Sequence, residues 1–545
     1  MRSGLVPLAR SRATPGRARG GARVTESAVK AGSRIVGAAG LLAASVLLAR
    51  LLGFARDALF ADRVGVGPAA DAYFAAFMIP DILGYLLAAG AAAIAVTPPY
   101  VKRLESEGPE AAARFASVVV GSVGLLSVSL TVVLWIFGEP LLRLQFGTFD
   151  EATLRETLHL MQIVLPAQIF FLTGGVLRGV LMAHGVFWPQ ALASVVYSAM
   201  PIVGGLLIPG SDGFAWGTLV GAAIGQWAIP AIALRRLPGA VGGVRIGLFD
   251  GDFREYAWLA LPLMLGLGLT TVDEWYEKWV GGRVAPGAIA AITYARKLMM
   301  APVGVVGQAV GAALLPSLAG LHQRGDREGF AALLTATLRT TLGLGLLAAG
   351  ALAALAGPAV RFLYEHGRFG ASDSAAVAGL LAVLAWAVPG WVVQQVAVRG
   401  FYARGEMWRA MGLSTVIALA AFPLYLWMGL ERGVRGLAMA SACAITASAM
   451  ITVFWLRARS GAPEVSALGA TLLRTGVITL AASAAAAFAL RALAARLDMA
   501  FGALLCGGAV YAAVSAAGVR LVGDGPLRDA MDGLLARLRR GGSSR

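Results

Sequence analysis

The sequence predicts an all-α polytopic membrane protein with about fourteen transmembrane helices. The chain has 545 residues, of which 58% are hydrophobic and only 14% are charged, and its mean hydropathy is +0.74. A soluble protein of this length needs far more charge to cover its surface. Apolar stretches of about 20 residues recur from one end to the other, and each is long enough to cross a hydrocarbon core of about 30 Å. The 70 glycines suit a bundle in which transmembrane helices approach one another closely.

Polar breaks divide the apolar stretches into the individual spans. We expect these spans near residues 35–61, 69–97, 112–137, 155–182, 187–208, 213–234, 255–281, 285–318, 329–357, 374–402, 408–430, 434–456, 468–493 and 498–522. Prolines stand inside several of them, for example Pro80 and Pro302, and predict kinked or broken helices. An even number of spans places both termini on the same side of the membrane.

The positive charge of the chain assigns that side to the cytoplasm. The formal net charge is +16, and the tail of residues 1–34 carries eight basic residues against one acid. Further arginines follow helix 6 in the linker 235–254 and occur in the tail 523–545, which reads as a basic amphipathic helix on the membrane surface. Lys and Arg remain preferentially on the cytoplasmic side of membrane proteins. The charge therefore indicates topology and anionic lipid partners, and we expect no nucleic acid partner.

The sequence lacks the residues that several classes of function require. The two cysteines, Cys443 and Cys506, lie in separate apolar segments, and the four histidines are scattered without metal-ligand spacing. The phosphate-binding pattern G-x-x-x-x-G-K-[ST] is absent, so we expect neither ATP hydrolysis nor a cofactor. No nucleophile–base constellation indicates an enzyme. A membrane glycosyltransferase would need a large outer loop, whereas the longest expected outer loops have about 15 residues.

A weak internal repeat divides the chain into two lobes. At a constant offset of 217 positions, Arg56-Asp57 aligns with Asp273-Glu274, and several glycines and prolines further along align as well. We therefore expect an N-lobe at 35–234 (helices 1–6), a C-lobe at 255–456 (helices 7–12), and two additional helices at 468–522. Parallel repeats of this kind bind cargo between the lobes and rock to alternate access. We expect the protein to function as a monomer.

Charged residues inside the spans are the candidates for function. A charged side chain costs about 2.5–3.5 kcal/mol at the centre of a membrane helix, so such residues usually face a wet cavity. Helix 1 contains Arg50, Arg56 and Asp57, and arginine suits the binding of phosphate or carboxylate. The alternative, that this end of the helix lies in water, applies mainly to Asp62 and Arg63.

Helix 2 contributes two acids. Asp71 stands at its start, where it can pair with Arg56 or Arg63 across the short hairpin, so a structural ion pair and a functional role are both open. Asp81 follows Pro80 well inside the span, and we interpret it as a carboxylate that faces the cavity.

Helices 7 and 8 contain a second charged group. Helix 7 carries Asp273, Glu274 and Glu277, and these acids are the candidates for coupling to a monovalent cation; the alternative is an outer helix end with a local pair between Glu274 and Lys278. In helix 8 the adjacent Arg296 and Lys297 are hard to place in lipid and favour a central anion site. A cavity with these cations predicts a transporter whose cargo carries anionic groups.

Two runs of sequence are distinctive. The first is Arg50-Leu51-Leu52-Gly53-Phe54-Ala55-Arg56-Asp57 together with the following segment 70–80, and the second is Tyr294-Ala295-Arg296-Lys297-Leu298. Both resemble the MurJ/MviN family of lipid II flippases, within the multidrug/oligosaccharidyl-lipid/polysaccharide exporter superfamily. The resemblance implies two six-helix lobes around a central cavity in a bacterial inner membrane, a groove of helices 13 and 14 for a lipid tail, and cavity arginines near the diphosphate of the cargo. By this resemblance Arg50, Arg56 and Asp71 match residues of the family motif, and Arg296, Lys297 and Asp81 complete the expected binding residues.

The sequence departs from the family pattern at two places. A basic pair usually follows the helix 2 proline, where this chain has Gly84 and Tyr85, and Arg296-Lys297 replaces an Asp-Arg pair in helix 8. We expect lipid II as the cargo in peptidoglycan synthesis, with another polyprenyl-diphosphate glycan (an O-antigen or capsule unit) as the alternative and a cation-coupled drug antiporter as a third. The membrane potential or a coupling cation would drive transport.

Overall fold

Helices make up all the regular structure of the described chain. A computed structural model describes residues 18–86, 92–265, 269–493 and 500–541, and every regular element within these ranges is a helix. Ten helical segments among them are long and apolar enough to cross a membrane. The predicted all-α polytopic class is confirmed, whereas the count of fourteen spans stays a prediction.

The predicted spans beyond these ten segments are the first, second and seventh. Residues 35–61 lie in one long helix, α1 (Ala18–Val64). The span 69–97 comprises α2 (Pro68–Ala76), α3 (Met78–Leu86) and α4 (Ala92–Ser106). The span 255–281 comprises α12 (Gly251–Leu265) and α13 (Leu269–Gly281). Residues 87–91, 266–268 and 494–499 lie outside the described ranges, as do the first 17 residues of the tail 1–34 and the last four residues of the tail 523–545.

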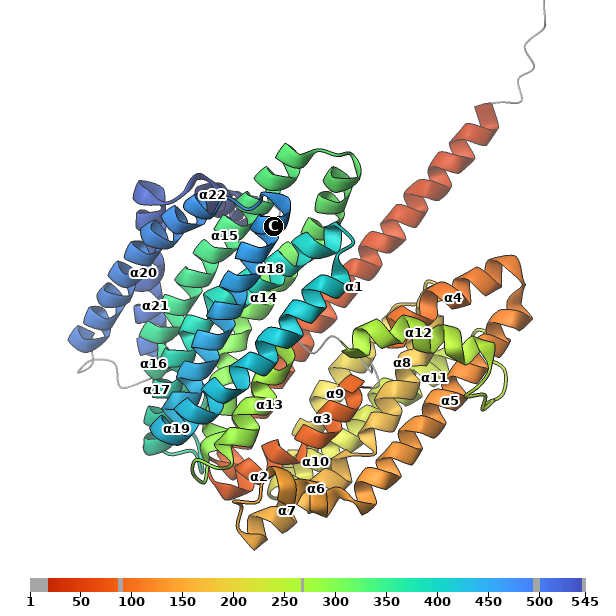
Figure 1. Cartoon of the computed structure of the whole chain (residues 1–545), viewed down its shortest axis with the longest axis horizontal. Helices are drawn as coiled ribbons and strands as arrows, with labels where there is room; N and C mark the ends of the chain where they lie inside the picture. The colour runs from red at the N-terminus through yellow and green to blue at the C-terminus, as the bar shows by residue number, and fades with distance from the viewer. Residues whose placement is uncertain (1–17, 87–91, 266–268, 494–499, 542–545) are drawn as a thin grey trace, which may run out of the picture.

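Figure 1 shows two bundles, with the long α1 projecting from between them. The first bundle continues with α5 (Pro109–Ile136), α6 (Gly138–Gln145), α7 (Glu151–Val164), α8 (Ala167–Ala183), α9 (Trp188–Leu207), α10 (Ser211–Gly221), the π-helix η1 (Ala222–Ala228) and α11 (Ile229–Leu234). Proline at the first position starts α2 and α5, where its missing N–H costs no hydrogen bond. Asp150 caps α7 by accepting a hydrogen bond from the backbone N–H of Thr153.

Glycines let α9 and α10 touch backbone to backbone. A Cβ atom built on Gly204 would lie 2.0 Å from the carbonyl oxygen of Gly213, and one on Gly217 would lie 2.5 Å from that of Met200. The two helices are in extensive contact, and α9 packs in turn on α1. Close approach through glycine is the packing that the glycine-rich composition predicts for membrane helices.

A buried arginine accompanies the π-helix. Arg178 of α8 is 8% exposed, and its Nη1 donates to the backbone oxygen and the side-chain Oε1 of Gln226, at 3.1 and 2.6 Å. Gln226 lies in η1, where the wider helical turn leaves a carbonyl available to a side chain. A Cβ on Gly174 would meet that carbonyl oxygen at 1.8 Å, so glycine is required there.

The second bundle holds α13 and the helices that follow it in the chain. These are α14 (Ala288–Gln323), α15 (Arg327–Ala354), α16 (Ala356–Tyr364), α17 (Ala371–Leu384), the short 3₁₀ turn η2 (Ala385–Ala387), α18 (Val388–Ala403), α19 (Met407–Ser460), α20 (Val465–Leu493), α21 (Ala500–Val522) and α22 (Gly525–Gly541). The 54-residue α19 contains both predicted spans 408–430 and 434–456. A kink at Gly433, where φ is +67°, separates the two spans. Only glycine adopts that backbone conformation readily.

The two halves of predicted helix 7 pack on different bundles. α12 contacts α4 and α5 of the first bundle, whereas α13 contacts α14 and α19 of the second. Arg103 of α4 holds α12 in place through ion pairs of 2.6 Å to Asp252 and 2.7 Å to Glu255. α12 therefore packs with the first bundle and α13 with the second.

A charge cluster fixes the last helices to the second bundle. Asp524, between α21 and α22, pairs with Arg339 at 3.0 Å and Arg474 at 3.2 Å and accepts a hydrogen bond from Thr471. Burial by itself would raise the pKa of the Asp524 carboxyl, but the Thr471 hydroxyl and the two guanidinium groups outweigh burial, and the pKa lies below its usual value. Asp524 therefore joins α15, α20 and α22.

Candidate functional site

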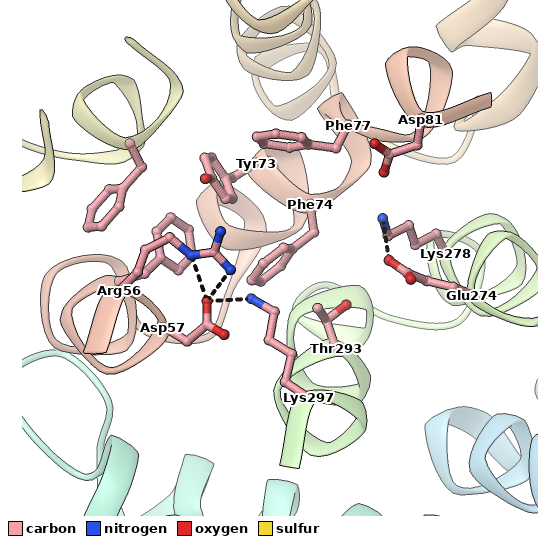
Figure 2. Close-up of a pocket in the computed structure, with 12 residues that line it drawn as sticks. Arg56, Asp57, Tyr73, Phe74, Phe77, Asp81, Glu274, Lys278, Thr293 and Lys297 are labelled. Carbon is pink, nitrogen blue, oxygen red and sulfur yellow. Dashed lines mark hydrogen bonds and ion pairs between the residues drawn. The ribbon is translucent and has the colours of Figure 1, made fainter. Parts of the chain in front are cut away.

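One buried carboxylate brings α1 and α14 together at the centre of the protein. Arg56 donates from Nε and Nη2 to Oδ1 of Asp57, at 3.0 and 2.9 Å. Nζ of Lys297 donates to the same oxygen at 2.8 Å, as Figure 2 shows. Asp57 is only 5% exposed. Two cations from different bundles share one acid, so this group carries a net positive charge.

A cavity of about 140 Å³ surrounds this group. Its wall combines charged side chains with aromatic rings, namely Arg56, Asp57, Phe60, Tyr73, Phe74, Phe77, Asp81, Phe214, Glu274, Lys278, Thr293 and Lys297. Nζ of Lys297 lies 4.7 Å from the centre of the Phe74 ring, where the ring face attracts a cation. Aromatic faces and charged groups together suit a cargo that has sugar rings and anionic groups.

Charges of both signs line the other end of the same cavity. Lys278 of α13 is 4% exposed and pairs with Glu274 at 2.8 Å. Asp81 projects from α3 of the first bundle toward this pair (Figure 2). The i,i+4 spacing predicts the Glu274–Lys278 pair, but sequence reasoning did not assign Lys278 to the site. The signal in the sequence was that Lys278 is the single lysine among three acids of a membrane helix, which indicates that its charge is paired inside the protein.

A second cavity, of about 480 Å³, lies between α1 and α14. Arg50, Lys297 and Arg296 line it together with Asp57 and Glu274, and the rest of its wall is mainly apolar. Among the described residues, no acid lies within ion-pair distance of Arg50. Leu47, Leu51 and Val305 border this cavity and are 61%, 58% and 66% exposed. Such exposure of large apolar side chains indicates contact with lipid.

Arg296 differs from the other predicted cavity cations. Its Nε donates to Glu277 and its Nη2 to Asp273, each at 2.6 Å. Both acids are buried, at 1% and 0% exposure. The expected role of Arg296 in holding cargo stays a prediction, and its guanidinium is engaged by these two acids inside the second bundle. The same contacts occupy Asp273 and Glu277, two of the three acids proposed for cation coupling.

Asp71 also has a different position from the one expected. It is 1% exposed and accepts hydrogen bonds from the backbone N–H groups of Gly287 at 2.6 Å and Ala290 at 2.7 Å. These are free donors at the start of α14, so Asp71 of the first bundle caps a helix of the second. It pairs with neither Arg56 nor Arg63, and it lies outside the two central cavities.

Further contacts join the bundles beside this cap. The hydroxyl of Tyr294 donates to the carbonyl oxygen of Gly65 at 3.1 Å, and the backbone N–H of Arg368 donates to that of Asp62 at 2.9 Å. Thr148 donates to the carbonyl oxygen of Gly282 at 2.6 Å. All these contacts lie at the end of the bundles where α1 finishes and α14 begins, so this end of the central cavity is closed.

The comparisons with known proteins agree with this architecture. The sequence model of the family described as "Lipid II flippase MurJ" matches residues 60–505. A "Probable lipid II flippase MurJ" of Rhizobium tropici is 30% identical over 415 residues, which cover 73% of this chain and 76% of the relative. A protein of the same name from Rhizobium meliloti (strain 1021) is 29% identical over 403 residues, covering 70% and 74%.

Two solved structures share the fold. "Lipid II flippase MurJ, inward closed conformation" superposes with a TM-score of 0.72 at 23% identity, covering 88% of this chain and 99% of that one. An inward-facing multidrug resistance transporter of the MATE family superposes with a TM-score of 0.66 at 17% identity, covering 77% and 95%. These similarities extend the shared architecture over most of the chain.

Proposed function

Because this chain belongs to the MurJ family of lipid II flippases, we propose that it carries lipid II across the bacterial inner membrane by alternating access. The observation that carries the proposal is the Asp57 carboxylate, shared by Arg56 and Lys297 inside a cavity between two bundles. The diphosphate of the cargo competes with this carboxylate for both cations. Binding of cargo therefore changes the contact between α1 and α14 that links the bundles.

The shape and charge of the two cavities favour one orientation of the cargo. The diphosphate binds Arg56, Lys297 and Arg50. The sugars lie along the aromatic wall, toward Asp81 and the Glu274–Lys278 pair, because carboxylates accept hydrogen bonds from sugar hydroxyls. The prenyl chain leaves through the apolar cavity between α1 and α14, whose exposed leucine and valine side chains face lipid.

The contacts between the bundles support an inward-facing state. The bundles are joined at the Asp71 end. The start of α1 and α22, which contain the described parts of the basic tails, lie at the opposite end (Figure 1). That end faces the cytoplasm if both termini are cytoplasmic, as the positive-inside rule predicts. Release of cargo outside then requires the Asp71 cap and its neighbouring contacts to break. The N-lobe 35–234 and the C-lobe 255–456 would rotate as units, with the additional helices 468–522 moving with the C-lobe, to which Asp524 attaches them.

The proposed transporter works as a single copy and without ATP. One chain contains both bundles and the cavity between them, which is the basis for function as a monomer. The cargo and the surrounding lipids are the partners. The membrane potential supplies the energy, since the cargo is anionic and moves outward, which the potential across the inner membrane favours. No ATP is required, because the sequence lacks a nucleotide-binding loop.

Complementation tests this proposal. The chain is expressed in a strain depleted of its own lipid II flippase, together with Arg56→Ala and Lys297→Ala, and with Arg63→Ala as the matched control, since Arg63 lies on the same helix but outside both cavities. We expect rescue by the wild type and the control, and loss of rescue by the two cavity variants. A wild-type chain that is well expressed and does not rescue rejects lipid II as the cargo.

One observation favours the second candidate, a flippase for another polyprenyl-diphosphate glycan. At Gly84, where the family resemblance leads one to expect a basic residue, a Cβ would lie 2.6 Å from Oε1 of Gln168. α3 therefore packs so closely on α8 that a side chain at this position must displace Gln168. Gly84 and Gln168 line a neighbouring cavity of about 300 Å³, which shares Phe77 and Asp81 with the central one. Its wall differs there from the family pattern, and failed complementation followed by transport of a different lipid-linked glycan would establish this alternative.

A further inference from the structure

The second bundle contains a buried charge cluster around Arg296. Asp273 and Glu277 lie one turn apart on α13, and Arg296 of α14 lies between them with 5% exposure. Nη2 of Arg296 is 2.6 Å from Asp273, and Nε is 2.6 Å from Glu277. The guanidinium is thus held on two sides by carboxylates.

Two hydroxyl groups of α19 complete the cluster. Ser441 donates to Asp273 at 3.0 Å and accepts from Arg296 at 3.3 Å, and the Tyr425 hydroxyl donates to Asp273. Two carboxylates and two hydroxyl oxygens in a closed core form the kind of all-oxygen ligand set that binds hard cations. In this chain the guanidinium occupies the middle of that set.

The charges of the two helices also cancel as a set. α13 carries Asp273, Glu274 and Glu277 against Lys278, a net charge of minus two, and α14 carries Arg296 and Lys297, a net charge of plus two. Lys297 is engaged with Asp57, and Lys278 with Glu274. Each buried acid of α13 therefore has a cation of the chain itself as a neighbour.

We propose that Arg296 is a resident cation, which fills a site that would otherwise take a monovalent metal ion such as Na⁺. The intact protein binds no Na⁺ or K⁺ at Asp273 and Glu277, and neutralising Arg296 converts this cluster into an alkali-cation site. The consequence for transport, that translocation does not require Na⁺, rests on the proposed function. The properties of the site itself do not depend on it.

Thermal unfolding of the purified full-length chain tests the site without any cargo. Its 12 tryptophans report unfolding, and chloride salts of Na⁺, K⁺ and N-methylglucamine are compared at equal ionic strength. We expect the wild-type Tm to be the same in all three salts. Arg296→Gln should unfold at a lower temperature in N-methylglucamine and regain at least about 3 °C with Na⁺ or K⁺, because a ligand that binds only the folded state raises Tm.

Two further variants make the test specific. Arg178→Gln removes another buried arginine, but one that is held by Gln226 and not by acids, so its Tm should not respond to the cation. The double variant Arg296→Gln/Asp273→Asn should fold without the excess negative charge and lose the response. If Arg296→Gln cannot be purified, the wild type and the single variant Asp273→Asn still test whether the intact protein binds Na⁺ at this cluster.

The proposal is overturned by either of two results. One is a wild-type chain that Na⁺ stabilises, with the stabilisation lost in Asp273→Asn. The other is a folded Arg296→Gln variant that responds to no alkali cation. Failure of the proposed transport function gives a different pattern. The chain then does not move lipid-linked cargo, but the Tm of the wild type is still independent of the cation and the Tm of Arg296→Gln still rises with Na⁺ or K⁺.

Discussion

The Asp71 cap gives the most quantitative prediction about the transport cycle. Its carboxylate accepts two hydrogen bonds, at 2.6 and 2.7 Å, from the N–H groups of Gly287 and Ala290. A hydrogen bond to a charged group contributes about 1.5–3 kcal/mol, so Asp71→Ala destabilises the state closed at this end by roughly 3–6 kcal/mol. Even the lower value changes the equilibrium between closed and open states about 100-fold. Asp71→Asn keeps one acceptor oxygen and should have a smaller effect.

Distances between spin labels measure this equilibrium. After replacement of the two native cysteines, labels at Glu151 and Glu431, both exposed and on different bundles, report the separation at the closed end. We expect Asp71→Ala to shift the distance distribution toward longer values in lipid nanodiscs. Asp62→Asn removes a partly exposed carboxylate at the same end and serves as the control. An unchanged distribution for Asp71→Ala would refute the role of the cap in holding the bundles together.

Three other expectations concern stability and the cavity. Asp524→Asn should lower Tm at neutral pH, because the pKa of the Asp524 carboxyl is depressed in the folded state. The difference in Tm from the wild type should persist above about pH 4 and disappear as the pH falls below that value. Unfolding scans at several pH values measure this difference. Gly174→Ala should destabilise the protein by about 1–3 kcal/mol or prevent its folding, since the new Cβ meets a carbonyl oxygen at 1.8 Å. Gly476→Ala should be tolerated, because the space around Gly476 is open. Equal Tm values for the two variants would contradict the close packing of α8 on η1 at Gly174. Lys278→Ala should reduce transport without lowering expression, because its ammonium lies in the cavity wall, and full activity of this variant would remove that end of the cavity from the cargo site.

The fold class followed from the sequence because the membrane imposes it. A bilayer requires apolar segments of a fixed length and satisfied backbone groups, so composition and the spacing of polar breaks are sufficient to predict a helical bundle. The division of predicted helix 7 between the two bundles was not predictable in the same way. The residues of this helix read as one continuous apolar segment, and α12 packs on the first bundle through contacts of Arg103 that lie far apart in sequence.

The candidate site was predictable in its residue types but not in its pairings. Charged residues inside the spans identified α1, α3, α13 and α14 as the walls of a cavity. The sequence could not show that Arg296 faces Asp273 and Glu277 while its neighbour Lys297 faces Asp57, because adjacent helical residues point about 100° apart and the rotation of each helix depends on its packing. For the same reason the role of Asp71 as a cap on a helix more than 200 residues away could not be read from the sequence.

The most direct test of the proposed function is the translocation of purified lipid II in liposomes that contain this chain as the only protein. The fraction of head groups that become accessible on the opposite side is followed over time. We expect rapid translocation by the wild type and a loss of about tenfold or more for Lys297→Ala, because a charged partner of the diphosphate is removed. Wild-type rates equal to those of empty liposomes, or an unchanged rate for Lys297→Ala, would contradict a cationic cavity that carries lipid II.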